Sequence, residues 1–270
     1  MIKNTAFIHY LADKIYSLDK ICRQNLNSKF IVSERDYVSN LLTFIKYPFG
    51  PFSSYSFAHS QTMPVNLEQK FGVDGVLIFK SGNEYKIGVF EAKMIKYGWD
   101  TMATPTISRF QRQLNNQLTI NPNIAVWEMF LNKNTVNRSL DPFGSTCVKP
   151  ATARTIIRRN PKWSYKDLFA LFHASATMNG NIALNLYDII YSMLECSFGT
   201  PLNYLPNGIS LYENNEINIP LIKDSVTQED IESINLFLAE SKFCSYTHID
   251  LNEELAIRRS IAIKDILDNN

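Results

Sequence analysis

Residues 73–93, VDGVLIFKSGNEYKIGVFEAK, decide the fold of this chain. Two strand-like runs rich in apolar residues, 73–79 and 85–90, flank the sequence SGNE at 81–84. Serine, glycine and asparagine favour tight turns, and short apolar runs on both sides of such a turn are typical of paired strands. The stretch therefore predicts a β-hairpin.

The register of this hairpin follows from its turn. A two-residue turn at Gly82-Asn83 and a four-residue loop at 81–84 give the same pairing, in which Asp74 lies directly opposite Glu91. Directly opposed residues share a face of the sheet, with their Cβ atoms about 4.5–5.5 Å apart. Lys93 points to the same face, because side chains two residues apart on a strand lie on one side. The sequence thus predicts two carboxylates and one amine close together.

This combination of side chains suits a metal ion. Two facing carboxylates repel each other, and one of them holds a proton unless a cation neutralises the pair. A hard divalent ion such as Mg²⁺, with Mn²⁺ as its substitute, takes a few carboxylate oxygens and keeps several waters. The expected metal ligands are Asp74, Glu91 and the backbone carbonyl of Ala92. Lys93 would orient the attacking water and stabilise negative charge on a phosphate, which predicts phosphodiester hydrolysis.

The tripeptide Glu-x-Lys has little value by itself. It also occurs at 68–70, 84–86 and 240–242. Only the copy at 91–93 follows an apolar strand and has an aspartate opposite it. The alternative interpretation is a solvated strand end that carries a surface ion pair.

The segments around the hairpin predict the rest of an α/β unit. Ser33 and Asp36 have the spacing of a capping box, which predicts a helix from there to about Lys46. Residues 107–118 have helical spacing, and 124–131 form an apolar strand candidate. The expected order is helix, strand, strand, helix, strand.

Val73-Asp74-Gly75 followed by Val89-Phe90-Glu91-Ala92-Lys93 resembles the signature of the PD-(D/E)XK nuclease superfamily, also called restriction-endonuclease-like. Val73 stands in the place of the proline of that motif. The resemblance implies an α/β fold with a restriction-endonuclease-like αβββαβ core. It further implies a Mg²⁺-dependent endonuclease of restriction or defence type, acting on DNA in preference to RNA. By resemblance, the catalytic set is Asp74, Glu91 and Lys93, with Glu34 as an accessory ligand and Gln113 as a polar positioner.

The same residues are compatible with other functions. The superfamily contains members that have lost catalysis, so the chain could be an inactive nuclease-like module that binds nucleic acid or protein. An RNA-directed nuclease or effector would share the same site. Many double-strand cutters dimerise, so a homodimer is one expected state, although no heptad or apolar stripe points to its interface.

Three regions follow from these patterns. Residues 1–32 form an N-terminal helical extension, 33–135 the nuclease-like core, and 136–270 a mainly helical C-terminal region packed on the core. In that last region we expect helices after Ser164 and at 182–198, 227–242 and 251–267, with two short strands at 209–222.

The composition is that of a soluble globular protein. Hydrophobic residues make up 45% and charged residues 20% of the 270 residues, which excludes a disordered or fibrous chain. No apolar window is long enough for a transmembrane helix, and the N-terminus lacks the apolar core of a secretory signal. The four cysteines are dispersed, as is typical of reduced thiols, so we expect a cytoplasmic protein without a membrane partner.

The net charge of +1 conceals a basic segment. Residues 149–166 contain six basic residues and no acidic one, whereas 226–254 contain seven acidic residues and one lysine. Local charge is what attracts phosphates, and the interleaved Trp163 and Tyr165 could stack on bases. A solvated helix face with Trp163 in the core is the alternative. The expected nucleic-acid contacts are Lys96, Arg109, Arg112, Arg154, Arg158, Arg159 and Lys162.

Overall fold

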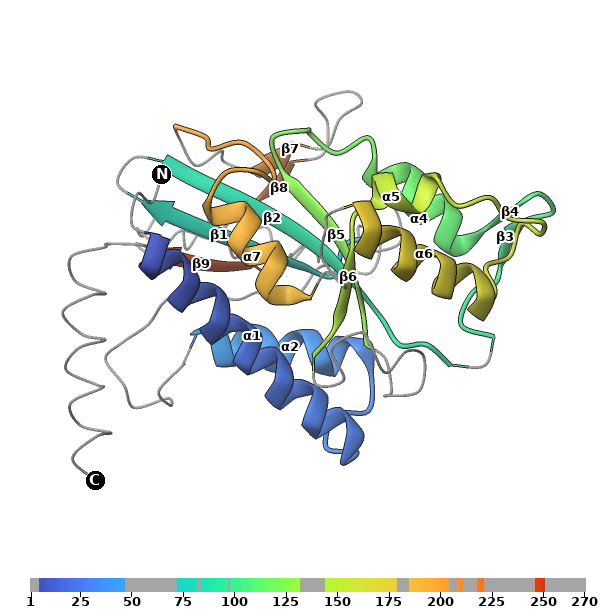
Figure 1. Cartoon of the computed structure of the whole chain (residues 1–270), viewed down its shortest axis with the longest axis horizontal. Helices are drawn as coiled ribbons and strands as arrows, with labels where there is room; N and C mark the ends of the chain where they lie inside the picture. The colour runs from blue at the N-terminus through green and yellow to red at the C-terminus, as the bar shows by residue number, and fades with distance from the viewer. Residues whose placement is uncertain are drawn as a thin grey trace.

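A computed structural model of the chain describes residues 5–46, 72–81, 84–96, 98–131, 144–178 and 185–203, and the strand backbones at 208–210, 218–220 and 246–250. These residues form a mixed α/β fold (Figure 1). The described helices are α1 (Thr5–Asn27), α2 (Glu34–Lys46), α4 (Arg109–Gln117), α5 (Pro150–Arg154), α6 (Tyr165–Met178) and α7 (Leu186–Leu194). The described strands are β1 (Gly75–Ser81), β2 (Glu84–Lys93), β3 (Met102–Thr104), β4 (Ile107–Ser108), β5 (Ala125–Phe130), β6 (Thr146–Val148), β7 (Gly208–Ser210), β8 (Asn218–Pro220) and β9 (Tyr246–Asp250).

A five-stranded mixed sheet, in the order β6-β5-β2-β1-β9, forms the centre of the described fold. β1 and β2 pair antiparallel with Gly75 opposite Phe90 and Ser81 opposite Glu84, which confirms the expected hairpin and its register. β2 then pairs parallel with β5, and α4 lies in the connection between them. The carboxyl ends of β2 and β5 therefore lie at the same edge of the sheet.

The caps read from the sequence are present. The backbone N–H of Asp36 donates to Ser33 Oγ at 3.0 Å, and the N–H of Ser33 donates to Asp36 Oδ2 at 3.1 Å. This reciprocal pair fixes the start of α2 at Glu34. Ser108 caps α4 in a simpler way, because its Oγ accepts the N–H of Gln111.

Several strands were not expected from the sequence. β6 and β9 form the two edges of the central sheet, so the region after residue 136 contributes strands to that sheet as well as helices. The short strand β3 lies before the helix expected at 107–118, and β4 takes the first two residues of that expected helix, so that α4 begins at Arg109. Two or three residues are too few to show the alternation that identifies a strand. The expected helices at 227–242 and 251–267 lie outside the described residues.

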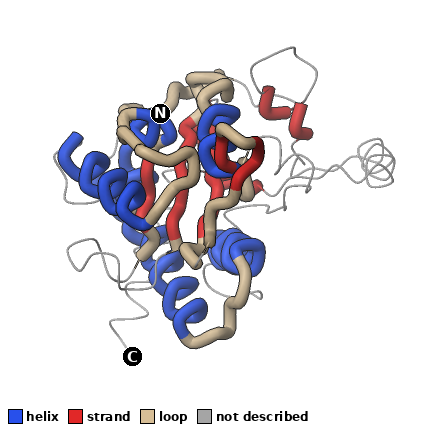
Figure 2. Tube along the Cα trace, turned by 90° about the vertical axis from the view of Figure 1, so that its right-hand side faces the viewer, coloured by secondary structure: helices blue, strands red, loops and turns tan. Residues whose placement is uncertain are grey.

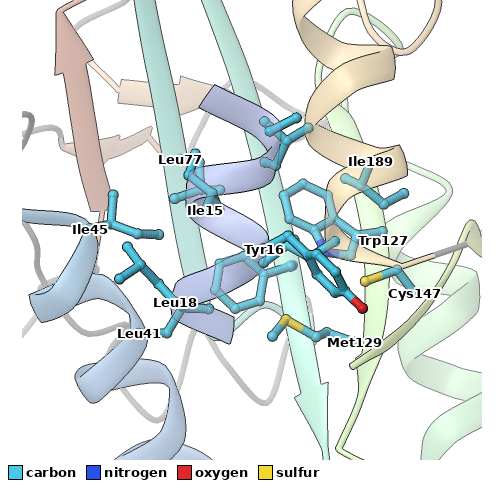
Figure 3. Packing of buried hydrophobic residues seen from close by; sticks show 14 of the residues in the cluster. Ile15, Tyr16, Leu18, Leu41, Ile45, Leu77, Trp127, Met129, Cys147 and Ile189 are labelled. Carbon is cyan, nitrogen blue, oxygen red and sulfur yellow. The ribbon is translucent and has the colours of Figure 1, made fainter. Parts of the chain in front are cut away.

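Helices cover both faces of the sheet (Figure 2). α1, α2 and α7 pack on one face, against residues such as Leu77 and Trp127, as the close view in Figure 3 shows. α4, α5 and α6 pack on the other face around Phe110, Phe130 and Trp163. Because successive strand residues point to opposite faces, each strand contributes side chains to both layers.

A buried polar group ties α1 to α2. The Tyr37 hydroxyl donates to Asp19 Oδ1 at 2.5 Å, and both the N–H and the hydroxyl of Ser145 donate to the same carboxylate. Burial raises the pKa of Asp19, and these hydrogen bonds partly offset the rise. No helix in the described part of the chain is long and apolar enough to cross a membrane.

Candidate active site

Asp74 lies directly before β1 and is held against β2. Its backbone N–H donates to the carbonyl of Phe90 at 2.8 Å, which continues the hairpin pairing by one bond. Its side-chain Oδ2 accepts the N–H of Ala92 at 2.7 Å. The carboxylate of Asp74 is therefore fixed beside the Glu91–Lys93 segment, as the register predicted.

Glu91 and Lys93 point to the face of the sheet that α4 covers. Their neighbours Phe90 and Ala92 pack into the opposite layer with α1, α2 and α7. Lys93 Nζ forms an ion pair with Glu91 Oε1, and the side chains of Lys93 and Glu91 are 14% and 3% exposed. Both side chains are much less exposed to solvent than those of a surface ion pair, so the alternative of a solvated strand end is wrong.

Gln113 reaches the same carboxylate from α4. Its Nε2 donates to Glu91 Oε1 at 3.1 Å, so the expected polar positioner does contact the site. The approach of α4 depends on Gly72, which has a φ of +60°, because a Cβ there would lie 2.8 Å from Gln113 Cβ. One helical turn later, Gln117 Nε2 donates to the carbonyl of Gly72 at 2.6 Å. These contacts position α4 over the end of the hairpin.

Glu34 enters the cluster from α2. As the first residue of that helix it reaches the end of β2, where its Oε1 accepts the N–H of Met94 at 2.6 Å. Its charge also acts on Lys93. The structure thus brings together Asp74, Glu91, Lys93, Glu34 and Gln113, the five side chains expected from the sequence and the resemblance.

Glu128 belongs to the same cluster and was missed from the sequence. It lies on β5 as the direct neighbour of Glu91 in the parallel β2–β5 pairing, and it is fully buried. Neither of its carboxylate oxygens has a hydrogen-bond partner among the described residues. The Gln117 side chain is near enough to lower its pKa, although the pair lacks standard hydrogen-bond geometry. A single acid inside the apolar run 124–131 was the available signal.

The cluster contains more negative than positive charge. Burial lowers the pKa of Lys93, but Glu91, Asp74, Glu128 and Glu34 more than offset this, and the net shift is well upward. Burial raises the pKa of Glu91 to about 7, with Lys93 acting against the rise and Glu128 adding to it. Burial likewise raises the pKa of Glu128 to about 8. Lys93 is therefore a permanent cation among four carboxyl groups.

Some of the carboxylate oxygens of this cluster are suitable ligands for a hard divalent cation, and others are already bonded within the protein. Asp74 and Glu91 supply carboxylate oxygens, and Glu91 Oε2 is buried with no hydrogen-bond partner in the part of the chain that the structure describes. Glu91 Oε1 is taken by Lys93 and Gln113. Within the described ranges, no group of three or more His, Cys, Asp or Glu residues is arranged to hold a metal ion. Mg²⁺ is often held by one or two carboxylates together with waters, so its binding by Asp74 and Glu91 stays a prediction.

Ala92 has a different observed contact from the one expected. It is fully buried on β2, and its N–H binds the Asp74 carboxylate. The role of its carbonyl as a metal ligand stays a prediction. The same residue nevertheless determines where Asp74 can point, because the hydrogen bond fixes one of the two carboxylate oxygens.

Most of the expected nucleic-acid contacts are on the surface. The exposed ones are Lys96, Arg109, Arg112, Arg154, Arg159 and Lys162. Arg158 is half-buried instead, and its guanidinium donates to Gln111 Oε1 and to the carbonyl of Pro161. It also packs over the ring of Trp163, 4.6 Å from the centroid. Trp163 is 2% exposed, so it is a core residue and cannot stack on a base.

The residues that converge on the end of β2 come from five elements or their flanks: α2, the start of β1, β2, α4 and β5. They provide buried carboxylates, a fixed ammonium and amide groups in one place. Comparisons of this chain with protein-family models, with curated proteins and with solved structures find no match.

Proposed function

We propose that this chain is a Mg²⁺-dependent endonuclease of the PD-(D/E)XK type, which hydrolyses phosphodiester bonds in DNA. The observation that carries the proposal is the convergence of Asp74, Glu91 and Lys93 at the end of the β1–β2 hairpin. A solvent-exposed ion pair would not need a second carboxylate from another strand or an amide from α4.

The order of elements around the site supports this proposal. A helix that begins with Glu34 precedes the hairpin, α4 follows it, and β5 returns parallel to β2. This order resembles the restriction-endonuclease-like core except that only two strands of the central sheet, β1 and β2, stand between α2 and α4 where the αβββαβ core has three. The contacts of Glu34 with Met94 and of Gln113 with Glu91 support the roles that the resemblance implies for them. The site lies at the carboxyl end of β2, where the parallel strand β5 also ends.

The chemistry assigns a distinct role to each side chain. Asp74 and Glu91 would hold Mg²⁺, which when bound polarises a phosphoryl oxygen and makes water a better nucleophile. Lys93 cannot act as a base at neutral pH, because the surrounding carboxylates raise its pKa. It instead donates hydrogen bonds to the attacking water and stabilises negative charge on the phosphate. Gln113 and Glu34 keep Glu91 and the end of β2 in place.

The exposed basic residues suit the polyanionic substrate. Arg109 and Arg112 lie on α4, the helix whose buried side contacts Glu91 through Gln113. Lys96 follows the end of β2 by three residues. These exposed cations would bind the sugar-phosphate backbone and offset the negative field of the site.

The proposal is tested by cleavage of plasmid DNA, single-stranded DNA and RNA with Mg²⁺ and with a chelator. The wild type is compared with Asp74→Ala, Lys93→Ala and a matched surface variant, Glu195→Gln. We expect cleavage that needs Mg²⁺, a loss of about 100-fold or more in the two site variants, and no loss in Glu195→Gln. Equal activity in wild type, Asp74→Ala and Lys93→Ala would overturn the proposal. RNA cleavage without DNA cleavage would assign the same site to RNA.

A binding module without catalysis is the second candidate. The ion pair between Lys93 and Glu91, together with the missing three-residue metal group in the described segments, favours it. A site that holds a metal gains thermal stability with Mg²⁺ or Mn²⁺, because ligand binding stabilises the folded state. No shift, combined with retained nucleic-acid binding, would favour the binding module.

A further inference from the structure

Helix α6 carries a row of exposed aromatic rings. Tyr165 and Phe169 are each 47% exposed, and His173 is exposed one turn further on. These residues are four positions apart in the helix, so they lie along one face of it. The rings of Phe169 and His173 are nearly parallel, with centroids 6.2 Å apart and planes 22° apart. A single exposed aromatic residue is common, but a continuous row of rings on one helix face indicates an interaction surface.

The aromatic row is not needed to hold α6 on the sheet. The buried side of the helix does this with Leu168, Leu171 and Phe172, which pack in the same layer as Trp163. The exposed side can therefore be changed without opening the core. Folding alone does not explain why aromatic side chains occupy that side.

The surface around the aromatic row is basic. Residues 149–178 contain six basic residues and a single acidic one, Asp167. The Asp167 carboxylate accepts the backbone N–H of Ser164 at 2.7 Å and the Ser164 hydroxyl at 2.6 Å, so it serves to cap α6. The exposed cations are Arg154, Arg159, Lys162 and Lys166. Such a local excess of positive charge attracts a polyanion and disfavours an acidic or purely apolar partner.

Helix α6 belongs to the layer that covers the candidate active site. α4, α5 and α6 pack on the face of the sheet to which Glu91 points, with α5 in contact with both of the other helices (Figure 1). Arg158 connects this layer, because its guanidinium donates to Gln111 Oε1 of α4 and lies over the Trp163 ring before α6. A nucleic-acid strand that extends from the site over this layer would contact the aromatic row and its cations.

We propose that the aromatic row of Tyr165, Phe169 and His173 binds single-stranded DNA, with unpaired bases stacked on the rings and phosphates bound by the neighbouring cations. Aromatic rings beside cations bind single strands in this way, because every unpaired base offers a flat face for stacking. In a duplex, those faces are covered by the neighbouring base pairs. This inference deepens the proposed nuclease function, and its choice of DNA over RNA rests on that function.

The test is the binding of a labelled oligothymidylate to the full chain in chelator, measured by fluorescence anisotropy. Wild type is compared with Phe169→Ala, with Phe169→Leu, which stays apolar without a ring, and with Phe169→Trp, which restores a ring. Tyr10→Ala is the matched control, because Tyr10 is 38% exposed on α1, across the sheet. We expect the alanine and leucine variants at Phe169 to lose about 5-fold or more in affinity, and Phe169→Trp and Tyr10→Ala to lose none.

Two further ligands separate stacking from charge. An abasic strand and a duplex of the same length should each bind wild type, Phe169→Ala and Phe169→Leu with equal affinity, because these ligands offer phosphates but no unpaired base. A loss of affinity for the abasic strand as large as that for oligothymidylate would overturn the stacking role. Equal affinity of oligothymidylate for wild type and Phe169→Ala would also overturn it. Tyr165→Ala gives the same comparison if Phe169→Ala fails to fold.

The remaining outcomes distinguish this inference from the proposed nuclease function. Binding of oligouridylate without binding of oligothymidylate overturns the choice of DNA. A change of oligomeric state in Phe169→Ala, seen by light scattering with DNA binding unchanged, assigns the aromatic row to contacts between copies of the chain and overturns the inference. Ring-dependent binding of oligothymidylate by a wild type that cleaves no DNA supports the aromatic row and overturns the nuclease function alone.

Discussion

The carboxylate of Asp74 accepts the backbone N–H of Ala92 at 2.7 Å across the β1–β2 hairpin. This bond joins the residue before β1 to the centre of the Glu91-Ala92-Lys93 tripeptide. The charge of Asp74 also raises the pKa of Lys93. The register of the hairpin therefore determines where the Asp74 carboxylate lies relative to Glu91 and Lys93.

Replacing Asp74 by asparagine and by alanine should have different effects on stability. Asparagine retains a side-chain oxygen that can accept the Ala92 N–H, whereas alanine leaves that N–H without its partner. We expect Asp74→Ala to lose about 1–3 kcal/mol of unfolding free energy, and Asp74→Asn much less. Urea unfolding in chelator measures both. Equal losses would show that the hydrogen bond does not hold the hairpin end.

The metal-free protein should lose stability as the pH rises through the neutral range. The folded pKa of Glu128 is about 8, against an ordinary value of 4.5, so its contribution is full below about pH 4.5 and is lost by pH 8. Lys93 opposes this shift, whereas Asp74 and Glu34 add to it. The unfolding free energy of wild type relative to Glu128→Gln should fall by at most about 1.4 kcal/mol per pH unit in this window.

Unfolding curves of both proteins at pH 5, 6, 7 and 8 in chelator check this prediction. Because Glu128 also raises the pKa of Glu91, the difference between the two proteins reports the titration of this pair of carboxyl groups. A difference that is constant with pH would contradict a raised pKa for Glu128.

Two buried tyrosines provide a matched test of the α1–α2 core. The Tyr37 hydroxyl donates to Asp19, whereas the Tyr16 hydroxyl is buried without a partner among the described residues. Tyr37→Phe should therefore cost about 1–3 kcal/mol, and Tyr16→Phe should be neutral or stabilising. Thermal or urea unfolding of the two variants gives the comparison. A larger loss for Tyr16→Phe would contradict the hydrogen-bond network.

The basic surface of α4 can be tested separately from catalysis. Binding of a DNA duplex is measured in chelator at several salt concentrations, for wild type and for Arg109→Gln with Arg112→Gln. Each lost phosphate contact should reduce the slope of log K against log salt by about 0.9. Lys29→Gln, at an exposed residue two positions after the end of α1, serves as the control. An unchanged slope in the arginine variant would show that Arg109 and Arg112 do not contact the DNA phosphates.

The sequence predicted those parts of the fold that depend on local chemistry. The SGNE turn determined the hairpin register, and the spacing of Ser33 and Asp36 determined where α2 begins. Both signals lie within a few residues of the structure they specify. The placement of Asp74 opposite Glu91 follows directly from the first.

The parts that were missed depend on contacts between distant segments. Glu128 joins Glu91 only because β5 pairs parallel with β2, and β9 joins β1 from more than 150 residues away. In the sequence, Trp163 and Arg158 are part of a basic segment that contains aromatic residues. In the structure, Trp163 is buried among apolar side chains of α4 and α6, and Arg158 packs on its ring. The spacing of residues within one segment cannot predict such contacts between distant segments.

The rate of Mg²⁺-dependent DNA cleavage by Asp74→Asn relative to wild type tests the central claim most directly. The variant keeps the Ala92 hydrogen bond, so a change in rate reports on the site and not on the fold. We expect a folded protein of near wild-type stability whose cleavage rate is at least about 100-fold lower. Cleavage at the wild-type rate, or wild-type cleavage that persists in excess chelator, would contradict it.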